Sequence, residues 1–237
     1  MTLDDSASAG QRKKFQEISE HLELLIFHGK LQPGDKIPSE RDLMAAFGAG
    51  RSSVREALFT LQRKGLLAVR PGAAARVTSP STDRMVSELS GAARHLLRQP
   101  QGVRDLQHAR ALLEIGLARH AALNASADDV AELAGSLEEN RLATDQDEFF
   151  RTDLLFHYTL ARITHNQIFT SLNTALNDWL ADQRRVSARS RASFGEVYAE
   201  HKAIYDAIAA KDPVGAETAM ERHLDLVAQR YWQHVTG

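Results

Sequence analysis

Between Leu31 and Val77 the sequence indicates two short helices separated by a glycine turn and followed by a hairpin. Ser39 and Asp42 stand three residues apart, which is the spacing of a capping box at the start of the first helix. The run Gly48-Ala49-Gly50 predicts a tight turn, and a second helix follows over about residues 52–64. Two helices in this order, with a hairpin directly behind them, indicate a winged helix–turn–helix.

Three arginines surround this pattern. Arg41 lies on the first turn of the first short helix, and Arg51 and Arg55 lie at the start of the second. The planar fork of an arginine can bond guanine or a phosphate at two points. Ser52 and Ser53 can add phosphate contacts beside the exposed N–H groups of the helix start. A lone arginine is usually a solvated charge, but three at these positions favour a DNA-reading helix.

Composition excludes several classes of protein. Hydrophobic residues make up 43% of the 237 residues, enough for a globular core, and no cysteine is present for disulfides or thiol chemistry. We find no apolar run of membrane-spanning length and no signal peptide, so we expect no membrane partner and a cytoplasmic location. Residues 1–78 carry 12 Lys and Arg against 9 Asp and Glu, and the rest is acidic, as in a nucleic-acid reader joined to another domain.

Four segments follow from these patterns. Residues 1–10 are small and polar and are expected to form a disordered tail. Residues 11–78 form the winged helix–turn–helix domain, which includes a helix over about 12–28 and a two-stranded wing. Residues 79–83 are small and polar and predict a linker. Residues 84–237 show helical periods only, which predict an all-α bundle of six or seven helices. The fold class is therefore mainly α.

Helix starts in the bundle are marked by capping patterns. Ser126 with Asp129, and Thr144 with Asp147, have capping-box spacing. Asp212-Pro213 combines an N-cap residue with a proline at the first helical position. The expected helices cover residues 85–97, 103–123, 127–142, 149–164, 168–186, 194–210 and 213–235.

Four side chains of the bundle form a candidate metal site. Asp153 and His157 stand four residues apart on one predicted helix and therefore share a face. His201 and His223 lie on two later helices. Three imidazoles and one carboxylate suit zinc, and also nickel or manganese. Because the chain has 10 histidines, spacing alone leaves open that these are ordinary surface or core residues.

The run PGDKIPSERDLMAAFGAGRSSVREAL, which begins at Pro33, resembles the signature of the GntR family of bacterial transcription regulators. The resemblance covers about residues 15–77. It implies a homodimer that binds a palindromic double-stranded operator. The DNA contacts that it implies are Arg41, Arg51, Arg55 and the wing tip at Gly72.

The wing differs from the family pattern, which usually reads Gly-x-Gly. Here Gly72 is followed by three alanines, so Ala74 stands where the second glycine is expected. The Cβ of an alanine restricts positive φ and close approach to DNA. The helix contacts therefore match the family better than the wing does.

After the linker, the chain resembles the FCD effector domain of the FadR branch of this family. The matching runs are ARALLE at Ala109–Glu114, DLLFH at Asp153–His157 and EHKAIYDAI from Glu200. The resemblance implies a metal held by the Asp and the three His named above, with a small carboxylate effector beside it. It also implies that Arg110 grips the effector carboxylate. An ion pair between Arg110 and Glu114, four residues on, is the alternative role.

These features predict a DNA-binding repressor that is controlled by a carboxylate. The runs GRSSVREALFTLQRKGL and ELSG are similar to those of regulators of sialic-acid catabolism in enteric bacteria, which makes sialic acid one candidate effector beside other sugar and organic acids. Two alternatives remain: a metal-dependent enzyme that uses the Asp/His site, and a regulator that senses the metal itself. Against the enzyme, no second carboxylate stands beside the ligands as an obvious general base, and the DNA-reading domain would have no role.

Overall fold

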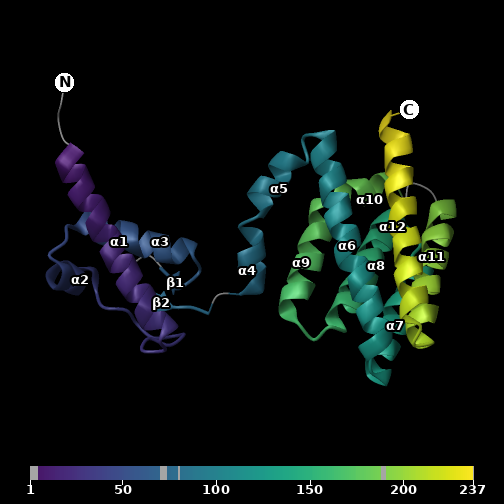
Figure 1. Ribbon diagram of the computed structural model, residues 1–237, viewed down its shortest axis with the longest axis horizontal. Coiled ribbons are helices and arrows are strands. Elements are labelled where there is room, and N and C mark those ends of the chain that lie inside the picture. The colour runs from purple at the N-terminus through teal and green to yellow at the C-terminus, as the bar shows by residue number, and fades with distance from the viewer. Residues whose placement is uncertain (1–4, 70–73, 80, 188–190, 237) are drawn as a thin grey trace. The chain divides into compact units, whose positions relative to one another are not determined.

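The structure is a computed structural model that describes residues 5–69, 74–79, 81–187 and 191–236 (Figure 1). Contacts between residues divide the chain into two compact units, Met1–Arg84 and Met85–Gly237. This division falls one residue beyond the predicted start of the helical domain.

The N-terminal unit begins with a long helix, α1 (Asp5–Phe27). This helix enters the segment 1–10, which the sequence predicts as a disordered tail, and so corrects that prediction from Asp5 onward. Lengthening an existing helix is far easier than starting one, and Ala7 and Ala9 are good helix formers. Residues 1–4 lie outside the described residues.

The predicted capping box is present at the start of α2 (Glu40–Phe47). The Ser39 Oγ accepts a hydrogen bond from the Asp42 N–H at 3.2 Å, and the Asp42 carboxylate accepts one from the Ser39 N–H at 3.3 Å. The helix ends at Gly48, whose φ of 56° lies in the left-handed region that glycine adopts without strain. The predicted tight turn follows directly.

Helix α3 (Arg51–Arg63) is the second helix of the helix–turn–helix. It begins one residue earlier than expected, because Gly50 is the last extended residue and Arg51 is already helical. One face of α3 packs into the core of the unit, in part against α1. The buried residues of this face are Ser53, Val54, Ala57, Leu58 and Leu61.

The wing is present as an antiparallel pair of short strands, β1 (Leu67–Ala68) and β2 (Arg76–Val77). Leu67 lies opposite Val77, and both side chains point into the core. The expected hairpin is therefore confirmed at its base. The wing tip at Gly72 lies outside the described residues.

The free edge of β2 is paired with the segment that precedes α2. The Gly34 N–H donates to the Val77 carbonyl at 2.8 Å, and the Ile37 N–H donates to the Ala75 carbonyl at 3.1 Å. The sequence did not indicate this third line of backbone pairing. It fixes the approach to α2 against the wing.

The chain that leaves β2 is bonded to the end of α3. The Thr78 N–H donates to the Leu66 carbonyl at 2.9 Å, and the Thr78 hydroxyl donates to the Gly65 carbonyl at 2.5 Å. Further along, the Arg84 guanidinium donates to the Gln62 carbonyl. The exit from the wing is therefore part of the folded unit.

Beyond the wing, the described residues form helices and no strand, which confirms the predicted fold class. The helices are α4 (Thr82–Ser87), α5 (Ser90–Leu96), α6 (Pro100–Asn124), α7 (Ala127–Leu142), α8 (Gln146–Arg162), α9 (Gln167–Trp179), α10 (Ala181–Ser187), α11 (Arg191–Ala209) and α12 (Pro213–Thr236). Helix α4 takes in the last two residues of the predicted linker 79–83.

Two expected helices are divided in the structure. The segment 85–97 is split between α4 and α5, and the segment 168–186 is split between α9 and α10. The second break lies at Leu180, whose φ of −96° and ψ of 14° leave the helical region. Leu180 is buried against Leu106 and Leu176, so the bend keeps an apolar side chain in the core.

Two of the predicted helix starts are confirmed. At α7, the Ser126 Oγ accepts from the Asp129 N–H at 3.1 Å, and the Asp129 carboxylate accepts from the Ser126 N–H at 2.9 Å. At α12, the Asp212 carboxylate accepts from the Gly215 N–H at 2.9 Å, and Pro213 is the first helical residue.

The start of α8 differs from the predicted Thr144–Asp147 box. Asp145 is the N-cap and accepts from the Glu148 N–H at 2.9 Å. The Glu148 carboxylate in turn accepts from the Thr144 N–H at 2.8 Å. An Asp is as good an N-cap as Thr or better, so the N-cap lies one residue further along the chain, and the Glu148 carboxylate bonds to the residue before it.

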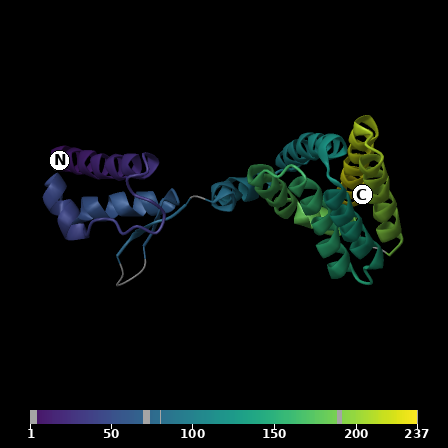
Figure 2. The same cartoon turned by 90° about the horizontal axis from the view of Figure 1, so that it is seen from below.

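The main core of this unit lies between α6, α7, α8, α11 and α12. Figures 1 and 2 show α11 and α12 side by side. None of the described helices is both long and apolar enough to span a membrane. The large side chains of the core include Phe156, Leu160, Ile204, Ile208 and Met220.

Candidate metal centre and DNA-reading surface

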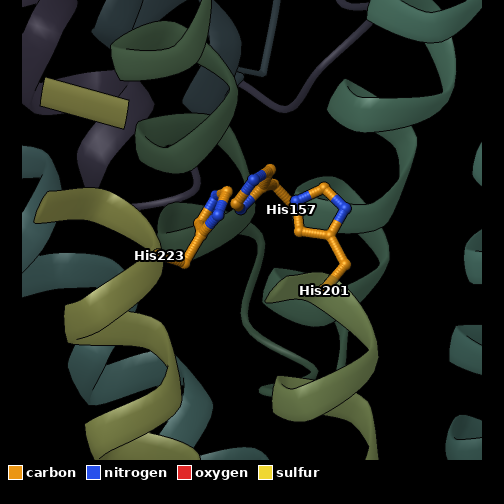
Figure 3. Close-up of side chains that lie close together, drawn as sticks. All are labelled: His157, His201 and His223. Carbon is orange, nitrogen blue, oxygen red and sulfur yellow. The ribbon is translucent and has the colours of Figure 1, made fainter. Parts of the chain in front are cut away.

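Three helices of the bundle each place one histidine at the same point. His157 on α8, His201 on α11 and His223 on α12 are all buried, with at most 1% exposed. Their rings turn toward one another (Figure 3), and the ring centroids are 4.7–5.3 Å apart. One nitrogen of each ring lies within 4.8 Å of one nitrogen of each of the others. The structure thus brings together histidines that are far apart in sequence.

Asp153 completes the set that the sequence predicts. It lies one turn before His157 on α8, and its Oδ1 is 3.5 Å from the Nε2 of His201. The Asp153 residue is 6% exposed, so its carboxylate is buried with the imidazoles. Asp153 therefore lies beside His201, while the group whose ligand atoms all lie within 4.8 Å of one another is His157, His201 and His223.

Two of the imidazoles are held from behind by polar side chains. The Nδ1 of His201 lies 3.3 Å from the Asn140 Oδ1, and the Asn140 amide donates to the Thr152 hydroxyl at 3.0 Å. The Nδ1 of His223 lies 2.9 Å from a Glu200 carboxylate oxygen. With Nδ1 donating to these partners, each ring keeps the lone pair of Nε2 as a ligand atom.

The third imidazole is held by a buried ion pair. The Nδ1 of His157 lies 2.5 Å from the Glu114 Oε2, and the Arg110 Nε donates to the Glu114 Oε1 at 2.8 Å. Arg110 is 5% exposed and Glu114 is fully buried. The ion pair between Arg110 and Glu114, one of the two roles expected for this arginine, is present. The guanidinium also reaches the centre, because its Nη2 lies 3.4 Å from the Nε2 of His157.

This cluster fits a divalent metal ion. Each imidazole turns Nδ1 toward an outer acceptor, as metal-binding histidines do when a second group fixes their orientation. Three nitrogens and one carboxylate oxygen suit zinc, nickel and manganese alike. The ring nitrogens already lie within 4.8 Å of one another. Small side-chain movements would bring them onto one ion, whose ligands lie at about 2.0–2.2 Å.

The outer partners are the part of the site that sequence reasoning missed. Asn140 and His201 are 61 residues apart, and no spacing pattern connects them. Glu200 directly precedes His201 but binds His223, on another helix. The sequence indicates Glu114 only as a partner of Arg110. Asn140 and Glu114 are buried and Glu200 is partly buried, so a search for polar residues on the inner helix faces would have found all three.

In the N-terminal unit, two of the predicted DNA-reading arginines lie beside one carboxylate. The Arg55 Nε donates to both Glu40 carboxylate oxygens, at 3.0 and 3.2 Å, and the Arg51 Nε is 4.0 Å from the same carboxylate. Arg41 follows Glu40 on the first turn of α2 and is also exposed. The Arg51 and Arg55 side chains are 69% and 64% exposed, as a DNA contact requires.

The two serines at the start of α3 lie on different sides of the helix. Ser52 is exposed, next to the first N–H groups of the helix. Ser53 is 2% exposed and lies on the core face. This corrects the prediction for Ser53, because a hydroxyl buried in the core cannot reach a phosphate. The contact predicted at Gly72 lies outside the described residues.

Two family models match the chain, one in each unit. The model for bacterial regulatory proteins of the GntR family matches residues 14–77, and the model for the FCD domain matches residues 105–226. The first match contains Arg41, Arg51 and Arg55, and the second contains the histidine cluster. Together the two matches cover the predicted DNA-reading segment and the predicted metal site.

Relatives match along nearly the whole chain. The HTH-type transcriptional repressor NanR of Klebsiella aerogenes is 42% identical over 221 residues, which is 92% of this chain and 85% of that protein. The repressor of the same name from Salmonella newport is 42% identical over 230 residues, 95% of this chain and 88% of its own length. Both are named as transcriptional repressors of the HTH type.

Among solved structures, a GntR protein of Streptococcus agalactiae is similar with a TM-score of 0.63 and 25% identity. The match covers 91% of this chain and 99% of that one. The winged helix–turn–helix, the helical bundle and the relatives all indicate the same family of regulators. The chain therefore belongs to the GntR family of bacterial regulatory proteins, carries an FCD domain, and is a NanR-like transcription regulator rather than an enzyme.

Proposed function

We propose that this protein is a repressor that binds operator DNA as a homodimer and releases it when a small carboxylate binds beside a divalent metal ion. One observation carries the proposal: the Arg110 guanidinium lies 3.4 Å from the Nε2 of His157, at the edge of the histidine cluster. A permanent positive charge and a metal-binding donor set thus meet at one buried point. The relatives named as repressors support the direction of control.

The charges around the cluster favour an anionic effector. Glu200 is neutralised by its ion pair with Arg230. A divalent ion and Arg110 then carry one positive charge more than is offset by Asp153 and Glu114. When bound, the ion would supply a positive centre for a carboxylate oxygen, and Arg110 would supply hydrogen-bond donors. A neutral ligand would leave the excess charge buried and uncompensated, which is costly.

Sialic acid is the first candidate for this carboxylate. It is a sugar acid, and the chain resembles regulators of sialic-acid catabolism in its DNA-reading helix. Other sugar acids and organic acids present the same carboxylate. They are the comparison set for any binding experiment.

On the DNA side, we assign the operator contacts to Arg41, Arg51, Ser52 and Arg55, with the wing tip at Gly72. Glu40 orients Arg55 through Nε and leaves the two Nη groups for a base edge or a phosphate. A symmetric dimer would read two half-sites about one helical turn, roughly 34–36 Å, apart. An effector that shifts the population of bundle conformations would change the spacing of the two readers.

The test measures operator affinity by fluorescence anisotropy, with duplexes selected from a random library. Zinc-loaded and chelator-treated protein are each titrated with sialic acid, other sugar acids and a neutral sugar. We expect an acid to weaken operator binding only for the zinc-loaded protein. If no acid changes operator affinity, the proposal is wrong.

Two further arms separate the alternatives. The double variant His157→Ala/His223→Ala should lose bound zinc and the response to acid, while its operator affinity without effector is kept. An operator affinity that follows zinc and ignores every acid would instead identify a metal-responsive regulator.

A further inference from the structure

Helix α3 exposes one large apolar side chain. Phe59 is 59% exposed, although every other apolar residue of this helix is buried in the core of the unit. It follows Arg55 by four residues, so the two side chains are neighbours on one helix face. Its neighbours on this face are polar or charged.

The position of Phe59 matches the face that a recognition helix turns to DNA. Ser52, Arg55, Glu56 and Phe59 are all exposed and stand at intervals of three, four and seven residues from the first. This is the spacing with which a homeodomain helix in the major groove contacts bases. The opposite face of α3 is buried in the core, so the four side chains point away from the unit.

The chemistry of the ring restricts what it can read. A phenyl ring has neither donor nor acceptor, so it cannot use the hydrogen-bonding groups of a base edge. Among the base edges in the major groove, the thymine C5-methyl is the apolar group. The structure therefore assigns to Phe59 a role in sequence specificity, as the residue that contacts a thymine methyl in each operator half-site. This inference rests on the proposed DNA contacts of Arg51 and Arg55.

The place of this thymine follows from helix geometry. Phe59 lies about 6 Å beyond Arg55 along the axis, at 1.5 Å per residue. This distance corresponds to about two base-pair steps of 3.4 Å. Because a recognition helix is inclined to the DNA axis, the thymine should lie about one or two base pairs from the base pair that Arg55 contacts.

The experiment removes single methyl groups from the DNA. An operator is first selected from random duplexes with the full-length wild-type protein. Each thymine is then replaced by deoxyuridine, one symmetric pair at a time, and affinity is measured by anisotropy. At one pair we expect a loss of about fourfold per half-site, because burying one methyl contributes about 0.8 kcal/mol.

Variants of the protein connect this effect to the ring. Phe59→Ala should bind the thymine and deoxyuridine operators equally well, and Phe59→Leu should keep part of the difference. Phe27→Ala is the matched control, because Phe27 is 82% exposed at the end of α1 in the same unit. It should keep the wild-type sensitivity to methyl removal.

The inference is overturned if Phe59→Ala keeps the wild-type sensitivity, or if wild type is insensitive at every thymine. A changed molecular mass of Phe59→Ala in sedimentation, with methyl sensitivity kept, would assign the ring to a protein contact instead. Failure of the proposed operator contacts is distinguishable. In that case Arg55→Ala binds the selected operator as tightly as wild type, whatever Phe59 does.

Discussion

The two units each contain an Arg–Glu pair of almost the same length in very different surroundings. In the N-terminal unit, the Arg55 Nε is 3.0 Å from Glu40, and the arginine side chain is 64% exposed. In the bundle, the Arg110 Nε is 2.8 Å from Glu114, with side chains 5% and 0% exposed. The two pairs therefore have nearly equal N–O distances but differ greatly in the free energy needed to break them.

Solvent determines what each pair can do. An exposed pair contributes at most about 1 kcal/mol, so Arg55 can turn from Glu40 to DNA at little cost. A buried pair cannot lose one partner without leaving an uncompensated charge, so Arg110 is held in place at the histidine cluster. The first arginine is available for binding, and the second is a fixed part of the site.

The largest expected effect comes from breaking the buried pair. Arg110→Ala should lower the free energy of unfolding of the bundle by about 3–5 kcal/mol, because Glu114 is left charged and buried. Urea unfolding measures this loss. Arg110→Met combined with Glu114→Leu should recover part of it, since no buried charge is then unpaired. A loss below about 1 kcal/mol for Arg110→Ala would show that the two pairs are energetically alike.

The next effect concerns the polar side chains that orient the histidines. The exposed Arg55–Glu40 pair has no such outer partners. Glu200→Gln should weaken zinc binding about 10–100-fold, because the carboxylate orients His223 and raises its basicity. Competition with a chromophoric chelator gives the affinity. Glu196→Gln is the control, since Glu196 lies on the same helix but its side chain is 62% exposed. Equal zinc affinity in the two variants would contradict the assigned role of Glu200.

The exposed pair should affect DNA binding and leave folding almost unchanged. Arg55→Ala should cost about 1–3 kcal/mol of operator affinity per base contact, while its free energy of unfolding stays within about 0.5 kcal/mol of wild type. Anisotropy and urea unfolding measure the two quantities. A large loss of stability with unchanged affinity would reverse the comparison.

The smallest effects come from two capping boxes that are matched between the units, Ser39/Asp42 and Ser126/Asp129. Each Ser→Ala variant removes an N-cap, a change that typically costs about 1 kcal/mol. Thermal unfolding followed by circular dichroism would show a small decrease in Tm for both. Different sizes of decrease would show which unit limits the stability of the chain.

The same boxes predict a dependence on pH. The hydrogen bonds from Ser39 and Ser126 lower the pKa of Asp42 and of Asp129 below the ordinary value of 3.8. Because the folded pKa is the lower one, the contribution is complete well above pH 3.8 and is lost as pH falls through the folded pKa. Urea unfolding between about pH 5 and pH 3 should show a smaller decrease for the Ser→Ala variants than for wild type.

Local signals made much of this fold predictable. Gly48 and Ser39 mark helix ends by backbone conformation and by short-range hydrogen bonds, and both are encoded within a few residues. The family signature added Asp153 and the three histidines as one set. Spacing alone places only two of these four residues on a common helix face.

Contacts across helices were not predictable in the same way. The roles of Asn140 and Glu200 follow only from the packing of α7 and α11 around the cluster. The backbone pairing of Gly34 with Val77 has no local sequence signal either, because so short a segment shows no alternation of apolar and polar residues. The phosphate contact predicted for Ser53 is wrong, because adjacent helix positions differ by about 100° and Ser53 falls on the buried face.

The hydrogen bonds at the exit of the wing have a mechanical consequence. Thr78 is bonded to Gly65 and Leu66 at the end of α3, and β2 just before it is bonded on both edges. A pull applied through the linker is therefore shared by several bonds loaded in parallel. The force would move the DNA-reading unit as a rigid body and leave the wing paired with its neighbours. The reading surface would then change its position without changing its shape.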